Sequence, residues 1–168
     1  MNSSKSKYPV VLGLIILVSA VVALAQQEKA YPFVGANGRY PTGGLVADEN
    51  GNLYGTTGEG GAHDSGIVYE MSPPVLPSGK WTETVLYSFA SGADGSYPNG
   101  SLIFDQSGKL YGTTGGGGSA NAGTVFELSP PSSPGTAWAE TVLYGFQGVG
   151  DGANPSAGLI FDVRGRFL

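Results

Sequence analysis

The chain has 168 residues, including 29 glycines, 11 prolines and no cysteine, and only 12% of its residues are charged. This length fits one domain of modest size. The plentiful apolar and aromatic residues exclude an intrinsically disordered protein, which has few hydrophobes and high net charge. Glycine combined with Tyr, Val, Thr and Phe predicts an all-β protein of short strands joined by tight turns.

The first 25 residues have the pattern of a secretory signal peptide. Lys5 and Lys7 precede an uncharged, mostly apolar run over residues 10–25, which closes on small residues before Gln26. We predict cleavage between Ala25 and Gln26. A membrane anchor is the alternative, but the run is shorter than the roughly 20 residues that a spanning helix needs. The absence of cysteine excludes a lipoprotein anchor, so we expect membrane contact only during export.

The remaining residues, 26–168, keep six basic and all thirteen acidic side chains, a net charge of −7. A nucleic-acid partner is therefore not expected, because no cationic stripe is available to displace phosphate counterions. Export without disulfides indicates a bacterial envelope or extracellular setting.

A tandem repeat of 57 residues organises the rest of the chain. Residues 41–97 align without a gap to residues 98–154, and about half of the aligned positions are identical. Residues 155–168 begin a third copy, and residues 26–40 contain part of a strand from a preceding one. Because propeller rings have about four to eight blades, we expect this sequence to be an incomplete array.

Each repeat is predicted to contain four strands. In the first copy they cover residues 44–48, 53–57, 66–71 and 81–89, bounded by Gly, Pro, Asn and Asp. The small residues of "LYGTT" suggest the innermost strand, and the fourth strand has apolar side chains on both faces, which predicts cover on both sides. One repeat buries too little apolar surface to stand alone. We therefore predict tandem four-stranded antiparallel blades, β-propeller-like, that share their faces.

The combination of "GLIFD", "GNLYGTT", "GTVFELSP", "WTETVLYSF" and "DGANP" resembles the GloVer (Gloeo-Verruco) tandem repeat of exported bacterial proteins. The resemblance covers about residues 31–168. It implies an extracellular or cell-surface location and supplies no enzymatic activity.

The residues that could carry chemistry all have a structural alternative. The glycine loops after residues 57 and 114 lack the helix or Gly-Lys-Ser/Thr of a phosphate site. Asp48 could begin a calcium loop, but Lys109 and Arg166 occupy ligand positions in the other copies, which favours a capped turn. His63 is the only histidine, too few for a metal site or a triad. No cofactor, metal or catalytic residue is therefore assigned.

Two further sets of residues have both a functional and a structural interpretation. Paired carboxylates can hydrolyse glycosides, but the mid-strand acids recur in both copies, which favours a role in the blade; they are Glu70, Glu83, Glu127 and Glu140. Repeated aromatic residues could stack on sugars or pack the blade, and packing is favoured; they are Tyr54, Tyr111, Trp81 and Trp138.

We expect a secreted bacterial repeat protein that acts as an extracellular binding or structural surface module, not an enzyme. The variable loops would contact a ligand through Glu59, His63, Asp64 and Asn121. A surface glycan or a protein could be the partner, and further blades or another chain would close a ring. The alternative is a fragment of an extracellular carbohydrate-active enzyme whose active site lies in other blades.

Overall fold

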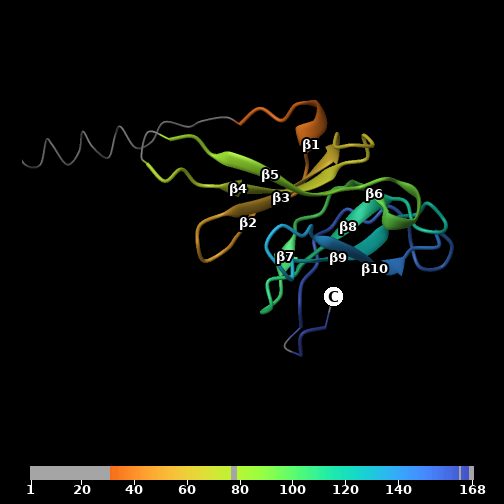
Figure 1. Cartoon of the computed structure of the whole chain (residues 1–168). Coiled ribbons are helices and arrows are strands. Elements are labelled where there is room, and N and C mark those ends of the chain that lie inside the picture. The colour runs from red at the N-terminus through yellow and green to blue at the C-terminus, as the bar shows by residue number, and fades with distance from the viewer. Residues whose placement is uncertain (1–30, 77–78, 163, 167–168) are drawn as a thin grey trace, which may run out of the picture. The chain divides into compact units, whose positions relative to one another are not determined.

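The computed structural model describes residues 31–76, 79–162 and 164–166, so the expected cleavage site at Ala25 lies outside the described residues. Residues 33–168 form one compact unit, to which all the contacts below belong. Among its described residues the regular elements are strands and two single-turn 3-10 helices, η1 (Gly35–Asn37) and η2 (Gly92–Asp94) (Figure 1). The all-β prediction is confirmed. No helix in the described part of the chain is long and apolar enough to cross a membrane.

Two antiparallel sheets follow one another along the chain, as the tandem pattern predicts (Figure 1). The first sheet contains β1 (Arg39–Pro41), β2 (Val46–Ala47), β3 (Leu53–Glu59), β4 (Ile67–Ser72) and β5 (Thr82–Ser88). The second contains β6 (Ser96–Pro98), β7 (Ile103–Phe104), β8 (Leu110–Gly116), β9 (Thr124–Ser129) and β10 (Ala139–Gly145).

In each sheet the edge beside the long strand β3 or β8 is formed by two short strands in place of one. β1 and β2 both pair with the same edge of β3, and β4 pairs with its other edge. Pro41 lies opposite Thr57 whereas Val46 lies opposite Tyr54, so two extra residues separate the paired segments. β6 and β7 repeat this arrangement beside β8. Four strand positions therefore carry five strands, and the sequence pattern missed β1 and β6.

The prediction that "LYGTT" forms the innermost strand is wrong in one respect. An innermost strand is an edge strand, but β3 and β8 have partners on both sides. Their small residues serve close approach instead. A Cβ atom at Gly55 would lie 2.6 Å from the Tyr69 hydroxyl oxygen, and one at Gly112 would lie 2.7 Å from Cζ of Phe126.

The main apolar core lies between the two sheets. Val68, Leu86 and Phe89 from the first sheet pack against a set from the second sheet and the loop before β7: Leu102, Leu110, Phe126 and Leu128. The rings of Phe89 and Phe126 meet edge to face, with centroids 5.2 Å apart. A smaller cluster covers the opposite face of the first sheet, where Phe33 packs on Tyr69.

Equivalent residues of the two copies show what the contact between the sheets buries. Leu86 is 8% exposed and Leu143, 57 residues later, is 42% exposed. In the other direction Leu102 is 2% exposed, whereas Leu45 is 56% exposed. Each leucine is therefore buried in the copy whose relevant face has a neighbouring sheet and more exposed in the other copy.

Hydrogen bonds between side chains and backbone reinforce this interface, joining residues 56 or 57 positions apart. The Thr42 hydroxyl donates to the Pro98 carbonyl at 3.1 Å, and the Gly44 N–H donates to the Ser101 hydroxyl at 2.9 Å. A Cβ atom at Gly43 would lie 2.7 Å from the Gly100 carbonyl oxygen, so this approach requires glycine.

The fourth strand is not covered on both faces as predicted. β5 and β10 are edge strands. Thr82, Thr84 and Val85 are exposed in β5, where Leu86 is the buried apolar side chain. The prediction failed because a strand at the edge of a sheet can have apolar side chains on both faces and still leave some of them exposed.

Candidate functional site

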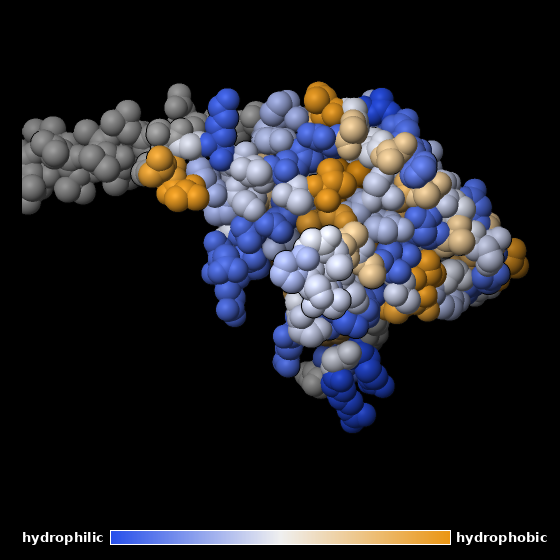
Figure 2. Space-filling model, in the orientation of Figure 1, coloured by the Kyte–Doolittle hydropathy of each residue, from blue (hydrophilic) through white to orange (hydrophobic). Residues whose placement is uncertain are grey.

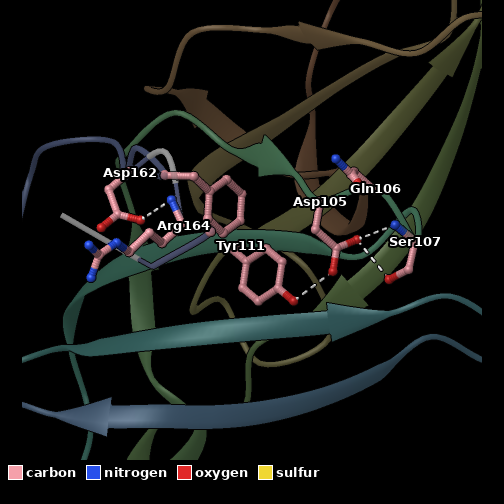
Figure 3. Close-up of a pocket in the computed structure, with 8 residues that line it drawn as sticks. Asp105, Gln106, Ser107, Tyr111, Asp162 and Arg164 are labelled. Atoms are coloured by element: carbon pink, nitrogen blue, oxygen red, sulfur yellow. Dashed lines mark hydrogen bonds between the residues drawn. The ribbon is translucent and has the colours of Figure 1, made fainter.

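A pocket of about 690 Å³ opens between the turn that follows β7 and the corresponding turn of the third repeat (Figure 3). Tyr111 lines it, and the Phe161 ring meets Tyr111 edge to face with centroids 5.6 Å apart. The same ring contact joins Tyr54 to Phe104 one repeat earlier. The lining residues are Asp105, Gln106, Ser107, Tyr111, Phe161, Asp162, Arg164 and Gly165.

The aspartate side chains of this pocket accept hydrogen bonds from backbone N–H groups of their own turns. Asp105 Oδ1 accepts from the Ser107 N–H at 2.8 Å and the Lys109 N–H at 3.0 Å, and Oδ2 accepts from the Tyr111 hydroxyl at 3.0 Å (Figure 3). Burial opposes ionisation of Asp105, but these hydrogen bonds outweigh it and lower its pKa.

The corresponding Asp48 and Asp162 make the same bonds to the backbone of their turns. Positions that a calcium loop would use for ligands hold cations instead. Lys109 Nζ lies 2.7 Å from Glu127 Oε1, and Arg166 pairs with Asp162. Within the described ranges no three His, Asp or Glu side chains gather into a metal-binding group. The arrangement is that of a repeated aspartate-capped turn.

The glycine loops, residues 60–66 and 117–123, hold three of the four predicted ligand-contact residues, and the fourth, Glu59, ends β3. Asp64 accepts from the Gly60 N–H at 3.0 Å, and Asn121 accepts from the Gly117 N–H at 2.9 Å. Both have a left-handed backbone, with φ of +56° and +53°, a conformation that Asn and Asp tolerate best among non-glycine residues. These side chains therefore close their own loops.

The first glycine loop brings three of the predicted residues together. Arg39 pairs with Asp64 and, at 3.1 Å, with Glu59, and His63 is exposed at the tip. The Arg39 hydrogen bond is the main cause of the lowered pKa of Asp64. Asn121 occupies the equivalent place in the second sheet and belongs to a separate loop. The four predicted residues therefore form two surfaces, not one site.

The mid-strand glutamates differ from one another. Glu70 accepts from the Ser72 hydroxyl, and Glu127 accepts from the Ser129 hydroxyl and Lys109 Nζ. In Glu140, Oε1 is buried without a hydrogen-bond partner among the described residues. Burial, followed by the nearby Asp94 charge, raises the pKa of Glu140 to about 7.

Among the aromatic residues, the exposed ones are not those that the sequence pattern singled out. Tyr54 and Tyr111 are buried, and their hydroxyls donate to Asp48 and Asp105. By contrast, Tyr40 and Tyr97 are 65% and 53% exposed. Their one signal in the sequence is that each immediately precedes the proline that opens a repeat.

The sequence profile of a family described as the Gloeobacter/Verrucomicrobia repeat matches residues 16–168. The match spans both sheets and the third copy, and its first residues fall within the expected signal peptide. No curated protein matches the chain.

Proposed function

Because the chain belongs to the Gloeobacter/Verrucomicrobia repeat family, we propose that it is an exported bacterial repeat protein that acts outside the cell as a binding or structural surface module. The basic head and apolar run before Gln26 support export. The excess of acidic side chains argues against nucleic acid as the partner.

The scaffold of this module is propeller-like, with sheets stacked face against face. The exposed equivalents of buried interface residues support it, because Leu45 and Leu143 would be buried by preceding and following sheets in the way that Leu102 and Leu86 are. Further repeats, in the same chain or supplied by another chain, are the partners whose surface chemistry fits these faces.

One observation supports a binding role rather than a catalytic one. The two copies keep their turn aspartates, interface glycines and core residues at 57-residue steps, whereas residues in and beside the glycine loops differ. Glu59, His63 and Asp64 are replaced by Gly116, Ala120 and Asn121. A constant scaffold with variable loops is the arrangement on which binding specificity is commonly built.

Two measurements test this proposal. The chain, expressed in a bacterium with its own N-terminal segment, should be recovered outside the cytoplasm with Gln26 as its first residue. An uncleaved protein that still begins at Met1, or retention of the protein in the cytoplasm, would contradict export. The purified protein should then bind members of a glycan and surface-protein array without converting them, and a wholly negative array contradicts the binding role.

A glycoside-cleaving role is the second candidate, and Glu140 is the observation that favours it. A carboxyl group with a pKa near 7 has the protonation that a general acid needs at neutral pH. Reducing-sugar release from polysaccharides that is lost in Glu140→Gln would support this role and overturn the non-enzymatic proposal.

A further inference from the structure

Tyr40 and Tyr97 hold an unusual backbone conformation. Each is the middle residue of a three-residue strand, β1 or β6, and each precedes a proline. Their φ angles are +55° and +56°, in the left-handed region where a bulky side chain is a genuine outlier. Such outliers persist only where the surrounding structure fixes them, and they concentrate at functional sites.

The last residue of the second repeat shows that this conformation does not require tyrosine. Asn154 stands at the equivalent position with φ of +52°, and asparagine is among the non-glycine residues that adopt this region most readily. Burial does not explain the two tyrosines either, since about half or more of each side chain is exposed. The backbone therefore favours asparagine, and the fold gives the tyrosine rings no core to fill.

Contacts with the first sheet and with β8 fix the Tyr97 position in the fold. The Tyr97 N–H donates to the Ser65 carbonyl at 2.9 Å, as the Asn154 N–H does to the Ala122 carbonyl at 2.7 Å. Pro98, the next residue, is fully buried. A Cβ atom at Gly116 would lie 3.5 Å from Cδ2 of Tyr97, so the ring lies beside β8 where the strand has no side chain. A ring held this way loses little freedom when a ligand binds.

The chemistry around these rings suits an uncharged polyhydroxylated ligand. Tyr40 lies between Arg39 and the proline that opens the first repeat. The Arg39 guanidinium forms ion pairs with Glu59 and Asp64. Tyr97 has Gly116 beside its ring, and Asn121 Oδ1 would lie 3.7 Å from a Cβ atom there. A flat apolar ring face with polar side chains nearby matches the apolar face and hydroxyl rim of a sugar. The net charge of −7 on residues 26–168 disfavours polyanions.

We propose that Tyr40 and Tyr97, which stand at equivalent positions 57 residues apart, are stacking platforms for the sugar rings of a neutral polysaccharide. Two platforms at equivalent positions of the repeat pattern favour a ligand that is itself a repeating polymer. After one sugar ring of the polymer has bound, a second ring is held near the other platform at a high effective concentration. This inference rests on the proposed binding function and names its ligand class.

Affinity electrophoresis of the exported chain tests the inference, in native gels containing hydroxyethylcellulose, xylan, glucomannan or dextran. At least one polymer should retard the wild-type protein. Tyr40→Asn and Tyr97→Asn should each weaken retardation, and the double variant should weaken it at least tenfold. Because asparagine suits the backbone, the double variant should melt at the wild-type temperature or above it. Tyr97→Phe keeps the ring and should bind normally, as should Val149→Asn, which changes another exposed residue.

Each contrary outcome has a distinct meaning. Equal retardation of the wild type and the double variant would overturn the tyrosine platforms and leave a binding function in place. Absence of retardation by all four polymers would also overturn the inference, and the array measurement would then decide separately whether the proposed binding function stands.

Discussion

At the scale of single residues, surroundings determine what each carboxyl group contributes to stability. Asp105 is buried in part, yet backbone N–H donors and Tyr111 lower its pKa. Its stabilising effect is present above the unfolded value of about 3.8 and is lost as the pH falls below it. Glu140 lacks such donors at Oε1, so burial raises its pKa to about 7.

This contrast predicts the pH dependence of folding. Between about pH 5 and 7 the folded state keeps the Glu140 proton that the unfolded state releases, so stability should fall as the pH rises and level off above 7. After allowance for solvent screening, the loss is on the order of 1 kcal/mol. Melting temperatures at pH 5.5 and 8 should differ in the wild type and in Glu49→Gln, an exposed control, but should converge in Glu140→Gln. An unchanged difference in Glu140→Gln would contradict this assignment.

At the scale of elements, the join between a glycine loop and the next strand sets the geometry of the sheet. Gly66 has φ of +95°, and a Cβ atom there would lie 2.5 Å from both the Thr57 carbonyl oxygen and Cδ of Pro98. Gly123 and Pro155 repeat this contact. The repeated glycine and proline are therefore explained by one close approach.

Two glycine substitutions separate backbone strain from lack of space. Gly66→Ala should reduce the free energy of unfolding by about 3 kcal/mol or more, because it adds a steric clash to the strain of a positive φ. Gly51→Ala also has a positive φ, +81°, but nothing lies within 4 Å of its Cβ position, so it should cost only about 1 kcal/mol. Urea unfolding measures both, and equal losses would contradict the steric explanation.

The sequence pattern predicted the elements better than their edges. Alternating β-branched and aromatic residues located β3, β4 and β5, and the 57-residue period predicted the second sheet. The pattern missed β1 and β6, because a three-residue strand with a left-handed tyrosine and a proline has no strand periodicity. It also missed Tyr40 and Tyr97 as candidate site residues, since their exposure depends on pairing with distant residues.

At the scale of the whole molecule, burial by the neighbouring sheet stabilises the repeat. Leu86→Ala should reduce the free energy of unfolding by about 2–4 kcal/mol, because it leaves a cavity in the core between the sheets. Leu143→Ala removes the same atoms from an exposed position in the second copy and should cost less than about 1 kcal/mol. Chemical denaturation of both variants provides the comparison, and equal losses would mean that contact between the sheets does not stabilise them.

Native-state hydrogen exchange of a Phe126→Leu variant tests most directly whether the two sheets depend on each other. Phe126 belongs to β9 of the second sheet and packs on Phe89 from the first. If the sheets are stable only together, amide protection in β4 and in β9 should fall by the same free energy. Loss of protection in β8 and β9 with unchanged protection in β3 and β4 would contradict the account.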